Sequence, residues 1–375
     1  MRAKGPVTTL AAGVVAFALG TPSALAVHIT VEGGGSRDPL TVAKAMFADP
    51  SQVTAADEAS DGVTEVSHAT LASWPQGLAG FPTNGADYGL ISSGNTDGAN
   101  DPNAEENKTT NETGSPGGLS EGLDEANQGN DLGGIEINFN APQVASPCLQ
   151  VDVKFLSDEF NEFIGSQFND FAVARLDNTA PPTVSIGASG FPEVSAPGNF
   201  LLDPSGSAIT VNGAYLVGDY DGSTTYDNAT PKLTAQTPVT PGGRTLNVWV
   251  GDAGDSIYDT TLFVDNIRVI DQNPCPVTTI GPSVFKKIKT KVKGAKAVIS
   301  GQMLPAIAGA KVFMTFLANG SPLKKVAKGK DTTNAEGEYK KKFKVPGGST
   351  KCMVKLQFKG DAFHTGSKAK KKFRC

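Results

Sequence analysis

Apolar and polar residues alternate with a period of two along several short stretches of the chain. Val151, Val153 and Phe155 are separated by Asp152 and Lys154, the pattern of a strand with one face in a core and the other in water. The same alternation recurs at residues 135–139, 149–156, 170–176, 209–217, 245–250 and 261–270. Glycine, proline and aspartate separate these stretches, so residues 27–275 are predicted to form an antiparallel, jelly-roll-like β-sandwich.

One short helix is predicted near the start of this domain. Asp38 is a preferred N-cap residue, and Pro39 follows it at the first helical position. The Asp49-Pro50 dipeptide should end the helix. Its apolar face consists of Leu40, Ala43 and Phe47.

Residues 92–131 have a different character, because they are mostly Gly, Asn, Ser, Thr and acidic residues. Such a composition cannot bury enough apolar surface to order a chain, so we expect a flexible insertion. A GxSxG match from Gly118 to Gly122 lies inside it. A nucleophile elbow needs a strand before that motif and a helix after it, so we interpret the match as fortuitous.

A second set of alternating stretches follows a proline-bearing linker at residues 276–284. These stretches have the spacing of strands in a small sandwich, and they occupy residues 297–301, 311–317, 339–345, 352–358 and 370–375. Residues 285–375 are therefore predicted to be a separate all-β domain. The total of 375 residues exceeds what one core usually fills, which agrees with two domains.

The first 26 residues have the pattern of a secretory signal peptide. Arg2 and Lys4 precede an apolar run at residues 7–19, and Ala24-Leu25-Ala26 is a small-residue cleavage site. The apolar run is too short for a membrane-spanning helix, which needs about 20 residues. We therefore expect a secreted protein, extracellular or associated with the cell surface, with no membrane span.

Charge divides the chain into two contrasting parts. Residues 27–275 hold 8 Lys and Arg against 34 Asp and Glu, a net charge of −26, whereas residues 276–375 hold 23 against 4, a net charge of +19. An acidic domain thus precedes a basic one. The lysine density would suit nucleic acid, but the predicted export argues against that partner. We expect instead that the basic domain binds an anionic cell-wall polymer, an extracellular glycan or the acidic domain itself. The alternative is that the lysines only solubilise the domain.

The four cysteines of an exported chain favour disulfides over metal or catalytic chemistry. Three pairings are possible. Bonds between Cys148 and Cys275 and between Cys352 and Cys375 would keep each cross-link within one domain. These two bonds are the prediction.

Two acidic loops each follow a predicted strand, and we expect both strands to lie in one sheet. The first loop carries Asp158, Glu159, Glu162 and Asp170, and the second carries Asp252, Asp255 and Asp259. Converging carboxylates either take up protons or attract a cation, and calcium accepts six to eight oxygen ligands. A structural calcium ion is therefore predicted, with the ligands Asp158, Glu159, Asp252, Asp255 and Asp259. The alternative is that these are solvated surface carboxylates.

The sequence gives less support to an enzymatic function. Glu159 and Glu162 would be the acid and base of a secreted glycan hydrolase. The chain has only two tryptophans and no evident aromatic-lined cleft, so a non-catalytic protein is preferred. Three histidines without HExxH spacing argue against a zinc enzyme.

Three stretches carry a resemblance to a known family. Residues 157–176 (SDEFNEFIGSQFNDFAVARL), residues 251–267 (GDAGDSIYDTTLFVDNI) and residues 38–50 (DPLTVAKAMFADP) resemble the signatures of the choice-of-anchor L family of bacterial exported proteins. This resemblance implies an extracellular β-rich domain with no agreed activity. The turn at residues 334–337 and the run FKGDAFHTGSKAK at residues 358–370 resemble bacterial immunoglobulin-like domains. The sequence thus predicts a surface- or matrix-associated binding or adhesion protein, and it leaves the ligand and the oligomeric state open.

Overall fold

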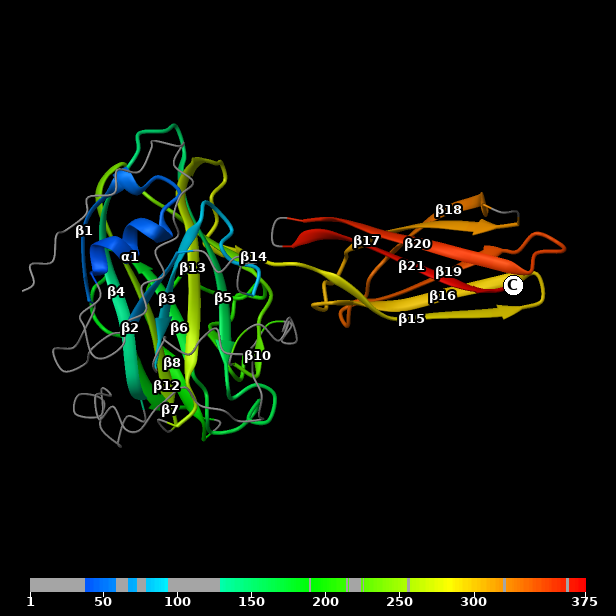
Figure 1. Ribbon diagram of the computed structural model, residues 1–375. Helices are drawn as coiled ribbons and strands as arrows, with labels where there is room; N and C mark the ends of the chain where they lie inside the picture. The colour runs from blue at the N-terminus through cyan, green and yellow to red at the C-terminus, as the bar shows by residue number, and fades with distance from the viewer. Residues whose placement is uncertain are drawn as a thin grey trace, which may run out of the picture.

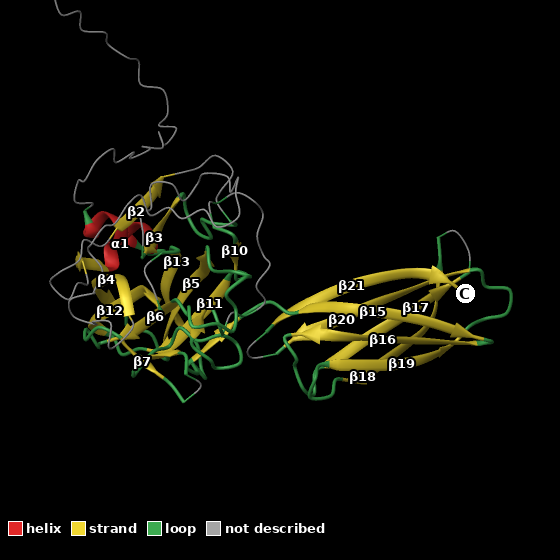
Figure 2. Cartoon of the chain, turned by 90° about the horizontal axis from the view of Figure 1, so that it is seen from below, coloured by secondary structure: helices red, strands yellow, loops and turns green. Residues whose placement is uncertain are grey.

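The chain forms two β-sandwiches that follow one another along the sequence (Figures 1 and 2). The computed structural model describes residues 38–58, 67–72, 79–93, 129–188, 190–213, 215, 224, 226–254, 257–319, 322–361 and 364–375. The predicted all-β fold is confirmed. The predicted signal peptide lies outside the described residues, as does most of the predicted insertion.

The first sandwich packs a five-stranded sheet against a seven-stranded one, and every strand pair in them is antiparallel. The five-stranded sheet has the order β1 (Val53–Glu58), β4 (Gly129–Ala141), β12 (Gly242–Ala253), β6 (Phe171–Leu176) and β9 (Ile209–Thr210). The other has the order β14 (Thr278–Ile280), β11 (Leu233–Pro238), β5 (Pro147–Ser157), β13 (Thr260–Asp271), β3 (Asp87–Ser92) and β2 (Ser67–Ala72), with β10 (Asn228–Ala229) beside β5. A short hairpin of β7 (Thr183–Ile186) and β8 (Pro192–Ser195) completes the unit.

The predicted helix is present as α1 (Pro39–Met46). Asp38 caps it, since its side chain accepts the Leu40 N–H at 3.2 Å. Val42, Ala43 and Met46 are buried in the core between the sheets. A 3-10 turn (Pro50–Gln52) follows. Among the described residues, no helix is long and apolar enough to span a membrane.

Both faces of β5 are buried, in contrast to the predicted half-exposed strand. Val151, Val153 and Phe155 face the core between the sheets as expected. Asp152 and Lys154 lie on the outer face but are each only 3% exposed. The Lys154 Nζ donates to the Ala79 carbonyl at 3.0 Å, and the Thr83 hydroxyl donates to Asp152 at 2.9 Å. A segment from an earlier part of the chain therefore covers this face.

Several strands of the first sandwich have no clear alternating pattern and were not predicted. These are β1, β2, β3, β7, β8, β10, β11 and β14. One predicted strand is shorter than expected: the prediction covers residues 209–217, whereas β9 contains only Ile209 and Thr210. The expected insertion at residues 92–131 overlaps the end of β3 and the beginning of β4.

The basic part of the chain is a seven-stranded sandwich with its own core. One sheet has the order β15 (Val284–Lys293), β16 (Lys296–Leu304) and β19 (Glu338–Lys344). The other has the order β18 (Lys324–Thr332), β17 (Lys311–Ala318), β20 (Lys351–Gly360) and β21 (Thr365–Arg374). Seven antiparallel strands in two sheets agree with the predicted immunoglobulin-like architecture.

Both predicted disulfides are present. Cys148 bonds to Cys275, with Cα atoms 5.6 Å apart, and Cys352 bonds to Cys375, with Cα atoms 5.7 Å apart. Each bond joins residues of the same sandwich. Cys352 is also part of the hydrophobic core of the second unit.

The connection between the sandwiches is short and hydrogen-bonded. The segment expected to be a linker contains β14, which pairs with β11 of the first unit, so only residues 281–283 separate β14 from β15. The Tyr215 hydroxyl donates to the Pro282 carbonyl at 2.6 Å. On the other side, the Thr365 N–H donates to the Gly281 carbonyl at 2.8 Å. Both sandwiches thus hold this connection in place.

Candidate functional site

The two predicted acidic loops begin on different sheets. Asp158 directly follows β5 of the seven-stranded sheet, whereas Asp252 lies in β12 of the five-stranded sheet. The expectation of one common sheet was therefore wrong. The chain crosses from one sheet to the other between β12 and β13, and β13 pairs with β5 so that Thr260 lies opposite Ser157. This crossing brings Asp259 beside the end of β5.

Asp158 occupies a fully buried position at this end of the sandwich. Its N–H donates to the Asp259 carbonyl at 3.1 Å, and its Oδ1 accepts the Asp227 N–H at 3.1 Å. The second oxygen, Oδ2, is buried and has no hydrogen-bond partner among the described residues. Burying a charge without a counter-charge costs free energy, so the ionised form of this carboxyl is disfavoured.

Asp170, which directly precedes β6, links the two sheets at the same end. Its Oδ1 accepts the Ala253 N–H at 3.0 Å, and its Oδ2 lies 2.6 Å from the Thr260 hydroxyl. That hydroxyl is also 2.9 Å from the Ser157 Oγ, which accepts the Glu159 N–H at 2.9 Å. The polar end of the sandwich is therefore a connected network that includes residues of β5, β12 and β13.

The electrostatic result is a carboxyl that strongly prefers its proton. Burial raises the pKa of Asp158 to about 9, and the negative charges of Asp259, Asp227 and Asp170 contribute to the shift in that order. The hydrogen bond from the Asp227 N–H opposes the shift but does not cancel it. At neutral pH such a group either stays protonated or is ionised next to a bound cation.

The predicted calcium ligands are only partly brought together. Asp158 and Asp259 are joined by a backbone hydrogen bond, and Glu159 and Asp252 are each 1% exposed. Asp255 lies outside the described residues. Among the described residues, no group of three or more His, Cys, Asp or Glu side chains is arranged to hold a metal ion. The calcium site therefore stays a prediction.

Two members of the cluster were absent from the predicted ligand set. Asp170 was identified as part of the acidic loop but not as a ligand, and Asp227 was not identified at all. Asp227 directly precedes β10, a two-residue strand that pairs with the end of β5. A strand of two residues has no periodicity in the sequence, so only the pairing of β10 with β5 reveals this neighbour.

The two glutamates of the hydrolase alternative are in different environments. Glu159 is buried, whereas Glu162 is exposed to solvent. The acid and base of a glycosidase both face the substrate. The hydrolase alternative stays a prediction that no observation in the described residues favours.

The second sandwich presents lysines on the outer faces of both its sheets. On the three-stranded sheet, paired positions place Lys289 opposite Ser300 and Ser300 opposite Lys340. The lysines of this face are Lys286, Lys289, Lys291, Lys293, Lys296, Lys340, Lys342 and Lys344. On the four-stranded sheet, the cations are Lys311, Lys325, Lys328, Lys330, Lys351, Lys355, Lys359, Lys368, Lys370, Lys372 and Arg374. Both faces are therefore strongly cationic.

Comparisons with known proteins do not place the chain in a family. No family model matches it, and no curated protein is significantly similar in sequence. Among solved structures, a β-glucuronidase from Parabacteroides merdae is similar over 66% of this chain and 27% of its own length, with 11% identity and a TM-score of 0.21. The chicken interferon gamma receptor alpha chain is similar over 64% of this chain and 91% of its own length, with 9% identity and a TM-score of 0.21. Likeness at this level carries no functional argument.

Proposed function

We propose that the protein is an exported, non-catalytic binding protein that its basic sandwich holds at an anionic extracellular surface or matrix. The signal-peptide pattern at residues 1–26 supports export. The two disulfides are compatible with an oxidising compartment. The resemblance of the first sandwich to choice-of-anchor L proteins supports the same assignment.

The observation that carries this proposal is the arrangement of charge in the basic sandwich. Lysines cover the outer faces of both sheets, and only four acidic residues accompany 23 Lys and Arg in residues 276–375. Exposed charges interact over a Debye length of about 8 Å at physiological salt. A dense array of cations therefore attracts a polyanion and repels other cationic surfaces.

The acidic sandwich has a separate role in the proposal. We infer that calcium binds at the Asp158 end of the first sandwich and stabilises it. The inferred ligands are Asp158, Glu159, Asp252, Asp255 and Asp259. The backbone hydrogen bond between Asp158 and Asp259 places these two residues side by side, and the negative charge of Asp259 helps to raise the pKa of Asp158. Both observations support this inference, because a cation would relieve the repulsion between the two carboxylates.

A truncation tests the attachment role. The full chain is compared with a chain that ends after Ser283, which keeps β14 in the first sheet and removes the whole basic sandwich. Binding to an immobilised anionic cell-wall polymer is measured from 50 to 500 mM salt. The full chain should bind and should lose affinity steeply as salt rises, whereas the truncated chain should not bind. Binding by the truncated chain, or binding that does not respond to salt, contradicts the proposal.

A further inference from the structure

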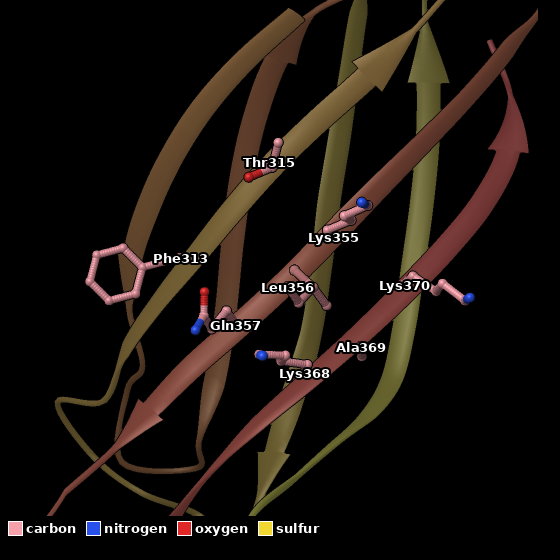
Figure 3. A pocket seen from close by; sticks show the side chains of 8 residues that line it. All are labelled: Phe313, Thr315, Lys355, Leu356, Gln357, Lys368, Ala369 and Lys370. Atoms are coloured by element: carbon pink, nitrogen blue, oxygen red, sulfur yellow. The ribbon is translucent and has the colours of Figure 1, made fainter. Parts of the chain in front are cut away.

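The four-stranded sheet of the basic sandwich has a groove on its outer face. The outer face of the three-stranded sheet, which also carries lysines, provides a comparison. The groove has a volume of about 420 Å³ and crosses β17, β20 and β21. Figure 3 shows the side chains that line it, which come from all three strands. The outward-facing ones are Phe313, Thr315, Lys355, Gln357, Lys368 and Lys370.

Strand register arranges these side chains in two parallel rows. Phe313 lies opposite Gln357, which lies opposite Lys368. One step along the strands, Lys355 lies between Thr315 and Lys370. Alternate residues on a strand are about 6.8 Å apart, and neighbouring strands are about 4.8 Å apart. The groove thus offers a regular grid that combines charged, neutral polar and aromatic groups.

No carboxylate interrupts this grid. The four acidic residues of residues 276–375 are Asp331, Glu336, Glu338 and Asp361. Asp331 pairs with the inward-facing Val312 and accepts the Lys340 N–H of the other sheet. Glu336 and Glu338 belong to the turn before β19 and to β19 itself, and Asp361 contacts His364 near the connection between the units. The groove face is therefore free of competing negative charge.

A cation lies over the aromatic ring in the groove. Phe313 is partly exposed, and the Lys359 Nζ lies 5.3 Å from its ring centroid. The ring therefore combines a flat apolar surface with a positive charge at one of its faces. The three-stranded sheet has lysines on its outer face but no aromatic residue there, and it also carries Glu338. The two faces therefore share charge but differ in recognition chemistry.

This combination of groups selects among polyanions. A lysine supplies a point charge for a carboxylate or a sulfate, whereas the Thr315 hydroxyl and the Gln357 amide suit neutral hydroxyl groups. A flat apolar ring suits the C–H face of a sugar. Single-stranded nucleic acid is usually bound by successive aromatic platforms, and base edges are often read by arginine forks. This face has one aromatic ring in the groove and a single arginine, Arg374, at the end of β21.

We infer that this groove is a binding site for an acidic polysaccharide, with a sugar ring against Phe313 and its anionic groups on Lys355, Lys368 and Lys370. The inference rests on the proposed attachment function and names the face and the ligand class that perform it. The lysines of the three-stranded sheet then contribute only long-range attraction. The carboxylate or sulfate substituents provide charge, and the sugar hydroxyls provide the specificity that a simple polyanion lacks.

Matched variants of the full chain test this inference. The groove variant carries K355Q, K368Q and K370Q, and the control variant removes the same charge from the other face with K289Q, K291Q and K342Q. A third variant, Phe313→Thr, removes the ring but keeps a residue that favours strands. Binding of labelled polygalacturonate, polyphosphate, single-stranded DNA and neutral dextran is measured at 150 mM salt. Thermal melts establish that every variant is folded.

The expected results separate recognition from charge. The groove variant should lose about tenfold in polygalacturonate affinity, and the control variant should lose about twofold, because exposed ion pairs contribute little unless they converge on one site. Phe313→Thr should weaken polygalacturonate binding several-fold and leave polyphosphate binding unchanged. Dextran should not bind.

Other outcomes overturn the inference in distinguishable ways. If the full chain binds no polyanion, the attachment function itself fails. Equal losses from the two triple variants mean that binding is only a charge effect, which overturns the groove but keeps the attachment. Tighter binding of single-stranded DNA than of polygalacturonate, lost in Phe313→Thr, identifies a nucleic-acid site instead. A polyphosphate affinity that falls together with the polygalacturonate affinity in Phe313→Thr also refutes sugar recognition.

Discussion

Replacement of Asp158 by asparagine should change how the stability of the first sandwich depends on pH. The pKa of Asp158 is raised from an ordinary value near 3.8 to about 9 in the folded protein, chiefly by burial and then by Asp259 and Asp227. Between these two values the folded state holds a proton that the unfolded state has released. Stability from this group is therefore complete below pH 3.8, declines steadily between pH 3.8 and about 9, and is lost above pH 9.

The size of the effect follows from proton linkage. One proton difference corresponds to about 1.4 kcal/mol per pH unit. From pH 6 to pH 8, wild type without calcium should therefore lose about 2.7 kcal/mol more unfolding free energy than Asp158→Asn. The asparagine of the variant keeps an oxygen that can accept the Asp227 N–H. The difference between the two proteins therefore does not come from the loss of this hydrogen bond. Saturating calcium should ionise the cluster, remove the extra slope and stabilise wild type by about 2.7 kcal/mol at 100 times its dissociation constant.

Urea unfolding followed by tryptophan fluorescence provides the measurement. Both tryptophans of the chain, Trp74 and Trp249, precede the basic sandwich, so the signal reports on the first unit. Glu162→Gln is the matched control, because it removes an exposed carboxylate from the same loop. Wild type and Asp158→Asn with the same pH dependence in chelator would refute the raised pKa. A calcium effect of equal size in both proteins would exclude Asp158 as a ligand.

Three further predictions concern the architecture. Cys352→Ser combined with Cys375→Ser should destabilise the basic sandwich by about 3 kcal/mol, as expected for a bond between residues 23 positions apart. In a calorimetric melt of the full chain, the transition of the basic sandwich should then move to a lower temperature. Gly281→Ala should loosen the connection between the sandwiches, because an added Cβ would lie 2.6 Å from Pro204 and 2.9 Å from Tyr215. Limited proteolysis should then cut residues 281–283 faster than in wild type. Unchanged cleavage would contradict the packed connection. Asp38→Ala should cost about 1 kcal/mol of first-unit stability through loss of the helix cap, measured by urea unfolding, whereas an exposed-site control such as Glu162→Gln should change stability by less than about 0.5 kcal/mol.

Local chemistry made the sequence informative about individual elements. Asp38 and Pro39 specify the start of α1 through capping and a fixed φ angle, which are properties of two neighbouring residues. Alternation located β4, β5, β6, β12 and β13 because side chains on a strand point to opposite faces. Charge counts and cysteine positions divided the chain into an acidic and a basic sandwich, each with its own disulfide.

Tertiary structure decided which elements meet, since strand pairing and sheet crossing depend on residues far apart in the chain. The sequence offered no sign that Asp227 approaches Asp158, or that the segment at Ala79 to Thr83 covers the outer face of β5 and buries Lys154. Part of the expected linker, Thr278–Ile280, is a strand because it pairs with the edge of β11. Local propensity does not specify this pairing. In the basic sandwich, the sequence showed many lysines, but only the register of β17, β20 and β21 arranged Phe313, Gln357 and Lys368 in one row.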